Sequence, residues 1–179
     1  MRTKFHFVKQ PLIAFLVPLL QAYNTGHLRS SFTRTSVTKT GDPIPWYSLP
    51  TVNFLTQRDF SKARVLEFGG GYSTMWWSKA AEHVTTFEED SRWINTFMSR
   101  VGANVEAHSL PSGLKGKELR VAISEKLNNT RALFDIVIVD AMHRETLTEM
   151  AFELVSEDGM VMVDNSEGYD TYEITKAKK

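Results

Sequence analysis

Short apolar runs alternate with longer segments of mixed polarity between residues 63 and 163. The most regular run, Phe134–Val139, is rich in β-branched residues and predicts a strand that is buried on both faces. Four other runs predict strands at 64–68, 84–87, 104–107 and 160–163. The segments between the strands predict helices at 73–81, 91–101, 117–127 and 144–155. Buried strands separated by helices indicate an α/β fold, with a mainly parallel sheet between two helical layers.

The first 60 residues have a different pattern and form an N-terminal helical extension before a domain at 61–179. The apolar run Pro11–Leu20 is too short to span a bilayer, and a poor cleavage site follows it. We expect a helix that packs on the domain or on a partner rather than a targeting segment, with a membrane-surface contact as a further alternative. Two prolines prevent regular helix in Gly41–Tyr47, and a short helix is expected over 49–57.

Charge and cysteine content narrow the functional classes. The 179 residues contain 21 Lys plus Arg and 21 Asp plus Glu, so the net charge is zero and gives no general attraction to nucleic acid. The basic residues nevertheless dominate the start of the chain, where no acid precedes Asp42. The chain has no cysteine, which excludes disulfides, thiolate metal sites and cysteine nucleophiles. This composition suits a reducing compartment, and we expect a cytoplasmic protein.

Three glycines follow the first predicted strand of the domain. In open parallel sheets, ligands bind beyond the carboxyl ends of the strands, and Gly69, Gly70 and Gly71 would let a ligand approach the main chain. Ser73 stands where a dinucleotide-binding motif has its third glycine. Glu67, two residues before the first glycine, suits a cationic amino group better than a pyrophosphate. We therefore interpret this turn as a ligand site rather than as a structural turn alone.

Acidic residues follow two other predicted strands. Glu88 lies about twenty residues after the glycines, a spacing at which an acid binds ribose hydroxyls. The alternative is a solvated acidic cluster, since Glu89 and Asp90 are its neighbours. Asp140 directly follows the most regular strand and should face the ligand cleft. His143 is either a general base or a surface histidine of the loop.

Asp164 and Asn165 follow the last predicted strand. Together with Asp140 of the neighbouring strand, their oxygen atoms could meet at one divalent cation. Asp-Asn pairs are also common in turns, and the sequence favours that interpretation over a metal site.

These residues together resemble the class I S-adenosylmethionine-dependent methyltransferases. More narrowly, the chain is similar to a bacterial-type group of uncharacterised members, and the likeness runs from about Gly26 to Tyr169. The segments that carry it are Gly41–Tyr47, Phe54-Leu55, Glu67–Thr74 with Trp76-Trp77, and Val84–Asp90.

The resemblance implies a Rossmann-like three-layer sandwich with strand order 3-2-1-4-5. It also implies that the glycine turn lines the methionine part of S-adenosylmethionine, that Glu88 binds the ribose and that the loop at Ser109 lies near the adenine. The expected cofactor-binding residues are Glu67, Gly69, Gly70, Gly71, Ser73, Glu88, Ser109 and Asp140. The expected catalytic residues are Asp140 and His143. The group Asp140, Asp164 and Asn165 also resembles the metal triad of catechol-type O-methyltransferases, although a divalent metal is not favoured.

The family usually continues past the fifth strand with a helix and an antiparallel strand pair. Here we expect that pair to be absent or truncated, with Tyr172-Glu173-Ile174 as a stub of strand. An uncovered edge invites pairing, so a homodimer could form through it or through the N-terminal helix. The alternatives to an active methyltransferase are a non-catalytic S-adenosylmethionine-binding module and, less favoured, an NAD-dependent oxidoreductase. The neutral net charge favours a small-molecule or glycan-like acceptor over nucleic acid.

Overall fold

The structure is a computed structural model that describes residues 4–128 and 133–166, with side chains from residue 13 onward. The chain divides into two compact units, Met1–Trp46 and Tyr47–Lys179. The first unit contains two helices, and the second contains the sheet with its covering helices.

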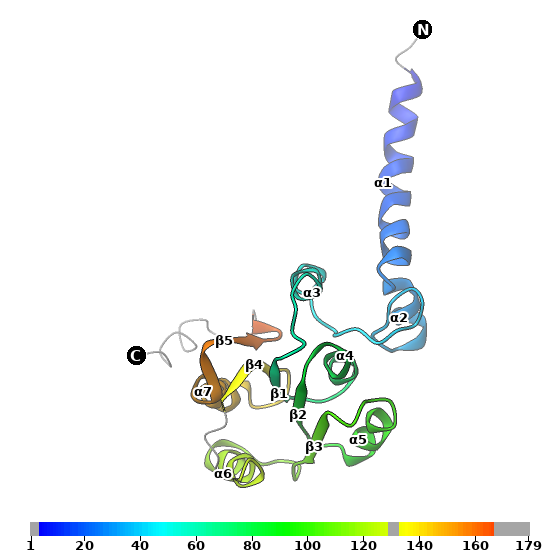
Figure 1. Cartoon of the computed structure of the whole chain (residues 1–179). Helices are drawn as coiled ribbons and strands as arrows, with labels where there is room; N and C mark the ends of the chain where they lie inside the picture. Colours follow the sequence, from blue (N-terminus) through cyan, green and yellow to red (C-terminus); the bar gives the residue numbers. More distant parts are fainter. Residues whose placement is uncertain (1–3, 129–132, 167–179) are drawn as a thin grey trace. The chain divides into compact units, whose positions relative to one another are not determined.

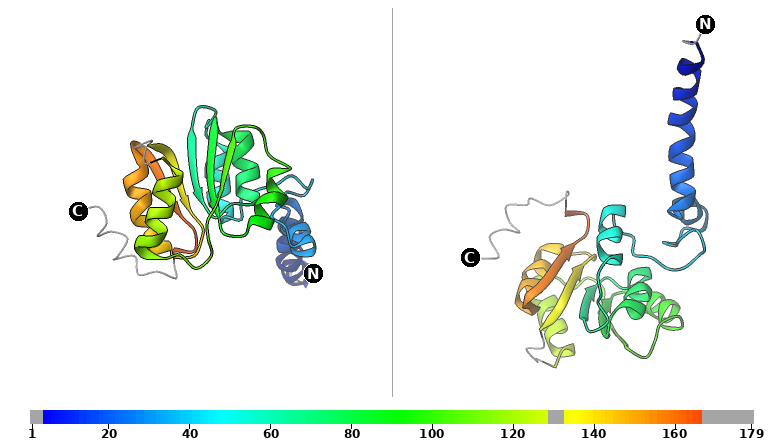
Figure 2. Two further views of the ribbon diagram at one scale, coloured as in Figure 1. Left: turned by 90° about the horizontal axis from the view of Figure 1, so that it is seen from below. Right: turned by 45° about the horizontal axis from the view of Figure 1, so that its top comes forward.

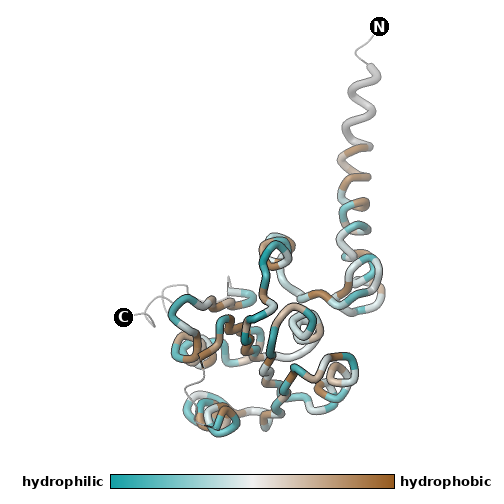
Figure 3. Tube along the Cα trace, viewed as in Figure 1, coloured by the Kyte–Doolittle hydropathy of each residue, from teal (hydrophilic) through white to brown (hydrophobic). Residues whose placement is uncertain are grey.

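Helices α1 (Lys4–Asn24) and α2 (His27–Thr33) make up most of the first unit (Figure 1). The helix expected over Pro11–Leu20 is present, but it extends beyond this apolar run in both directions and continues through Pro18. The coloured part of α1 in Figure 3 contains both hydrophobic and hydrophilic residues. The segment Gly41–Tyr47, with its two prolines, contains no helix, as expected. In the described part of the chain, no helix is long and apolar enough to cross a membrane.

The second unit is a five-stranded sheet with helices on both faces (Figures 1 and 2). The strands are β1 (Arg64–Phe68), β2 (His83–Glu88), β3 (Val105–Ser109), β4 (Phe134–Val139) and β5 (Val155–Val163). The helices are α3 (Leu49–Thr56), α4 (Tyr72–Ala80), α5 (Ser91–Met98), α6 (Gly116–Lys126) and α7 (Arg144–Leu154). The strand order is β3-β2-β1-β4-β5, and all four strand pairings of this sheet are parallel. The predicted α/β, Rossmann-like architecture and its strand order are therefore confirmed.

Successive residues of the strands pack against different helical layers. On one face, Leu66 of β1 belongs to a core that includes Leu147 of α7 and residues of α6. On the other face, Val65 packs in a second core with Leu55 of α3 and Trp77 of α4. The two-residue repeat of the strand thus builds one apolar core on each side of the sheet, which explains the unbroken apolar runs in the sequence.

The fifth strand is longer than the sequence predicts. The pattern indicates a strand over 160–163, but α7 ends at Leu154 and β5 begins at the next residue. Between Val155 and Met160 the strand advances five residues while its partner β4 advances two, so β5 contains a bulge. The bulged residues are polar or glycine and do not show the alternation of a strand. The stub predicted at 172–174 lies outside the described residues.

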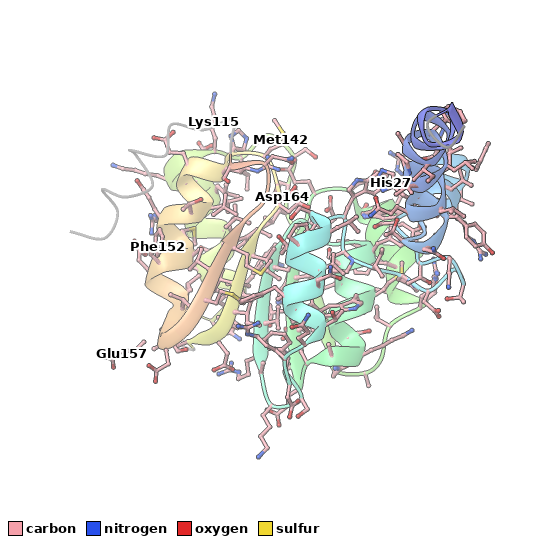
Figure 4. All side chains as sticks on the ribbon, turned by 90° about the horizontal axis from the view of Figure 1, so that it is seen from above. His27, Lys115, Met142, Phe152, Glu157 and Asp164 are labelled. Atoms are coloured by element: carbon pink, nitrogen blue, oxygen red, sulfur yellow. The ribbon has the colours of Figure 1, made fainter. Side chains whose placement is uncertain are left out.

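Backbone hydrogen bonds continue past the strand ends and fix the loops that follow. Gly69 after β1 donates to β2 (2.8 Å), Asp140 after β4 donates to β1 (2.9 Å), and Asp164 after β5 donates to β4 (3.0 Å). The end of the sheet at which the parallel strands have their carboxyl ends is called the carboxyl edge below. Figure 4 shows Asp164 and Met142 at this edge and Glu157 at the opposite end of the strands. The acidic residues that were expected to share a ligand site are therefore held at one edge.

Gly69 occupies the tightest position at this edge. Its φ of +98° is a conformation that residues with a side chain rarely adopt, and an added Cβ would lie 2.1 Å from the carbonyl oxygen of Asp140. The ends of β1 and β4 can approach this closely only because residue 69 lacks a side chain.

We expect Gly69→Ala to destabilise the protein much more than Gly113→Ala. Gly113 also has a positive φ, of +83°, but an added Cβ there meets no atom within 4 Å. The control variant should therefore lose only about 1 kcal/mol of unfolding free energy from backbone strain. Gly69→Ala should lose about 1 to 3 kcal/mol more, because the loop after β4 must move. Urea denaturation measures both values, and equal losses would show that the close approach to Asp140 costs nothing.

Candidate functional site

Two cavities lie at the carboxyl edge of the sheet, one toward each helical layer. The first cavity, of about 350 Å³, lies toward α6 and α7 and is lined by Phe68, Gly69, Phe87, Glu88, Glu89, Leu110, Leu119, Asp140, Ala141, Met142, Arg144 and Leu147. The second cavity, of about 310 Å³, lies toward α3 and is lined by Tyr47, Ser48, Thr51, Ile138, Met162, Val163, Asp164, Asn165 and Ser166. Each wall contains one aspartate that directly follows a strand, Asp140 in the first and Asp164 in the second.

Glu67 is fully buried beside the glycine turn, on the α4 side of β1. Its Oε2 accepts hydrogen bonds from the hydroxyls of Thr74 and Thr86, the latter at 3.4 Å. The Thr74 hydroxyl in turn accepts the N–H of Gly71 at 2.8 Å. In the described part of the chain, Oε1 of Glu67 has no hydrogen-bond partner. A buried carboxyl oxygen without a donor is costly, so a ligand that brings an N–H group to it would gain binding free energy.

The protonation of Glu67 is shifted by the same surroundings. Burial raises its pKa from 4.5 to about 7, although the nearby hydroxyls of Ser73 and Thr74 act in the opposite direction. The negative charge of Asp140 raises this pKa further. Glu67 is therefore divided between its neutral and ionised forms near pH 7, and a cationic ligand would favour the ionised form.

The glycine turn is also held tightly by its neighbours. The indole N–H of Trp93 donates to the carbonyl oxygen of Gly70 at 2.8 Å. An added Cβ on Gly70 would lie 2.7 Å from the Thr86 hydroxyl, and Ser73 is buried in the first turn of α4. Packing alone thus requires glycine at positions 69 and 70. The carboxyl groups near the turn, and not the glycines themselves, therefore indicate a ligand.

Glu88 ends β2 and lines the first cavity. Its Oε1 accepts the backbone N–H groups of Glu89 (2.8 Å) and Asp90 (2.9 Å), which fix the carboxylate at the cavity wall. No hydrogen bond of the described residues uses Oε2, which can therefore accept hydroxyl groups of a ligand. Ser109 pairs with Glu88 across the sheet but is exposed, and the next residue, Leu110, lines the cavity in its place.

Arg144, the first residue of α7, joins the ends of β4 and β5. Its guanidinium donates to the Asp140 carboxylate at 3.1 Å and to the side-chain oxygen of Asn165 at 3.4 Å. It also donates to the backbone carbonyls of Ala141 (2.9 Å) and Asp164 (3.0 Å). The predicted group of two aspartates and one asparagine is thus brought together, around a guanidinium. Among the described residues, no cluster of three or more His, Cys, Asp or Glu could hold a metal ion.

Asp140 is partly buried between these groups. Burial raises its pKa, repulsion by Asp164 raises it further, and the Arg144 guanidinium acts in the opposite direction. A carboxyl group with a raised pKa accepts a proton more readily, which suits a general base at a ligand cavity.

His143 is placed differently from Asp140. It precedes α7 with left-handed backbone angles (φ 61°) and is partly buried, and it belongs to neither described cavity wall. The structure therefore brings only one of the two predicted catalytic residues to a cavity, and the role of His143 stays a prediction.

Tyr47 was not among the predicted site residues, although it lines the second cavity. Its ring packs against the core on the α3 side, and its hydroxyl oxygen is shielded from solvent. Neither this oxygen nor the indole nitrogen of Trp77 has a hydrogen-bond partner among the described residues. The signal in the sequence is the pair Pro43 and Pro45, which fixes the backbone just before Tyr47.

Comparison with known proteins leaves the function open. The sequence matches no family model and no curated protein. Among solved structures it is similar to a functionally unknown protein from Deinococcus radiodurans R1, with 16% identity and a TM-score of 0.46. This match covers 67% of the present chain and 52% of the other, so the chain spans about half the length of that protein.

The raised pKa of Glu67 predicts a pH-dependent effect of Glu67→Gln on stability. From pH 4.5 to about 7, the unfolded state loses a proton that the folded state keeps, so the wild-type protein loses stability as the pH rises. Glutamine does not titrate. The difference in unfolding free energy between the variant and the wild type should therefore shift by about 2 to 3 kcal/mol in favour of the variant between pH 5 and pH 8. Urea denaturation at both pH values measures this gain. Glu82→Gln, at an exposed carboxyl, is the control, and an equal gain there would contradict the assignment to Glu67.

Proposed function

We propose that this chain binds S-adenosylmethionine at the first cavity and transfers its methyl group to an oxygen or nitrogen of an acceptor. The observation that carries the proposal is that Glu88 and Asp140, at the ends of β2 and β4, line one cavity together with Gly69 of the glycine turn. Glu67 is buried behind the turn, on the α4 side of β1 and outside the cavity wall, and its Oε1 is unpartnered among the described residues.

The residues present fit the chemistry of this cofactor. Glu67 lies behind the glycine turn and outside the cavity wall, so its carboxylate would favour a bound ammonium group through its charge and not through a direct hydrogen bond. The carboxylate of Glu88 suits a pair of ribose hydroxyls. The apolar side chains of Phe68, Phe87 and Leu110 on the same wall suit a planar adenine ring.

The chain's own residues would mainly hold and orient the reactants, because methyl transfer is largely a positioning task. When bound, S-adenosylmethionine supplies a methyl carbon that its positively charged sulfur makes electrophilic. Asp140 lines the first cavity and lies beside Asp164 of the second, so it is placed to take the proton of an acceptor. We favour it over His143, which lines neither cavity.

The contacts of Arg144 and the two cavities also bear on whether the protein requires a metal and on the class of acceptor. We propose no requirement for a divalent metal, because the Arg144 guanidinium already binds the carboxylate and carboxamide that would be its ligands. The zero net charge and the size of the two cavities support a small-molecule or glycan-like acceptor rather than nucleic acid.

Calorimetric titration with S-adenosylhomocysteine tests cofactor binding. We expect Glu88→Ala to weaken this binding about tenfold or more, because hydrogen bonds to a charged carboxylate contribute about 1.5 to 3 kcal/mol. Glu82→Ala is the matched control, since Glu82 is exposed and precedes the other end of the same strand. Its affinity should equal that of the wild type.

The other outcomes would contradict the proposed site or indicate a different function. No binding of S-adenosylhomocysteine to the wild-type chain, or equal binding by Glu88→Ala, would contradict the proposed site. Stabilisation by NAD and not by S-adenosylhomocysteine in a thermal-shift comparison would indicate an oxidoreductase. Binding without methyl transfer to any acceptor would indicate a non-catalytic module.

A further inference from the structure

The second cavity has a distinct chemical character. Its polar lining consists of hydroxyl, carboxylate and carboxamide groups from Tyr47, Ser48, Thr51, Asp164, Asn165 and Ser166, and its apolar floor comes from β4 and β5. No lysine, arginine or histidine belongs to the described wall. A phosphate or carboxylate ligand would therefore meet the charge of Asp164, while the adjoining Arg144 guanidinium is already engaged by Asp140 and Asn165.

The Tyr47 hydroxyl is the most informative group of this wall. Burial raises the pKa of Tyr47 well above 10, and the negative charges of Glu67, Asp140 and Asp164 act in the same direction. The phenol is therefore protonated at neutral pH, and its buried proton has no acceptor in the part of the chain that the structure describes. The Trp77 indole N–H lies beside the phenol oxygen and acts to lower this pKa, although neither group has a partner of good hydrogen-bond geometry among the described residues.

These donors and acceptors favour a neutral ligand with hydroxyl groups over a cationic ligand. An ammonium group has no lone pair, so it cannot accept the proton of Tyr47. A hydroxyl group can accept from Tyr47 and at the same time donate to a carboxylate such as Asp164. Several hydroxyls on one neutral molecule would match the serine, threonine and asparagine side chains of the same wall.

The second cavity also adjoins the first through its carboxylates. Asp164 of the second wall is close enough to Asp140 of the first to raise its pKa, and Arg144 binds the loops that carry both. A molecule in the second cavity would thus lie next to the group proposed above as the general base.

We infer that the second cavity binds a neutral, polyhydroxylated acceptor such as a sugar unit, with the Tyr47 hydroxyl donating a hydrogen bond to one of its oxygens. Tyr47 would then be a specificity-determining residue, which accepts neutral sugars and, with Asp164, disfavours phosphorylated or carboxylated ones. This inference rests on the proposed function, because it concerns the acceptor of the same reaction.

Saturation-transfer NMR with defined sugars tests the inference on the full chain saturated with S-adenosylhomocysteine. The probes are the methyl glycosides of glucose, galactose, mannose and rhamnose, compared with glucose 6-phosphate, glucuronate and glucosamine. We expect binding of at least one neutral glycoside and weaker binding of its charged counterparts. Tyr47→Phe should weaken the neutral glycoside about fivefold or more, as expected for a lost hydrogen bond.

Two controls keep the result specific to the Tyr47 hydroxyl. Tyr23→Phe makes the same change at an exposed position of α1 and should leave sugar binding unchanged. Tyr47→Phe should keep the melting temperature of the free protein or raise it, because the hydroxyl that it removes has no partner there. A melting temperature that falls on this change would indicate a structural role instead.

The inference and the proposed function fail in different ways. If S-adenosylhomocysteine binds but no neutral glycoside does, or a charged sugar binds more tightly, the inference is wrong and the proposed function stands. Equal sugar binding by Tyr47→Phe and the wild type also overturns it. If S-adenosylhomocysteine itself does not bind, the proposed function is wrong.

Discussion

The close approach of β1 and β4 at Gly69 is the constraint on which the rest of the site depends. The N–H of Asp140 donates to β1, and the carbonyl oxygen of Asp140 occupies the space that a side chain at position 69 would need. This approach fixes where the loop after β4 begins. It therefore fixes the distance between the glycine turn and the Asp140 carboxylate, and through Arg144 the position of the loop after β5.

The electrostatics of this edge follow from how few cations its described residues contribute. Glu67, Asp140 and Asp164 lie close enough to affect one another or Tyr47, and Arg144 is the cation that binds Asp140. Burial raises the pKa values of Glu67 and Asp140, and repulsion from neighbouring carboxyl groups raises them further, so that the pKa of Glu67 reaches about 7. Such an edge favours ligands that are cationic or rich in hydroxyls. It also holds a carboxyl group that can take up a proton during a reaction.

The fold was predictable because its strongest signals are local. Phe134–Val139 was predicted with the observed bounds, since a run of apolar and β-branched residues is typical of a strand buried on both faces. The strand order, by contrast, was predicted from a family resemblance and from no single segment. The start of β5 was missed because its bulged residues interrupt the apolar alternation.

The site was predictable only in part, for a related reason. Carboxylates after strand ends are visible in the sequence, and the structure holds Glu67, Glu88 and Asp140 at one edge. Whether a buried oxygen has a partner depends on side chains distant in the sequence. The unpartnered oxygens of Glu67 and Tyr47 and the arginine at the centre of the metal-like group therefore could not be inferred from the residue pattern.

The two-residue repeat of β1 links the fold to both proposed ligands. Phe68 points toward α6 and α7 and lines the first cavity, while Glu67 points toward α4 and the side of the sheet that Tyr47 covers. Adjacent residues of one strand thus serve opposite faces of the sheet. A shift of β1 by one residue would place a carboxylate in the apolar core and an aromatic ring beside Tyr47. The same alternation that builds two cores therefore also separates a cavity with an apolar wall from one lined by hydroxyls, and sets them side by side at the end of the sheet.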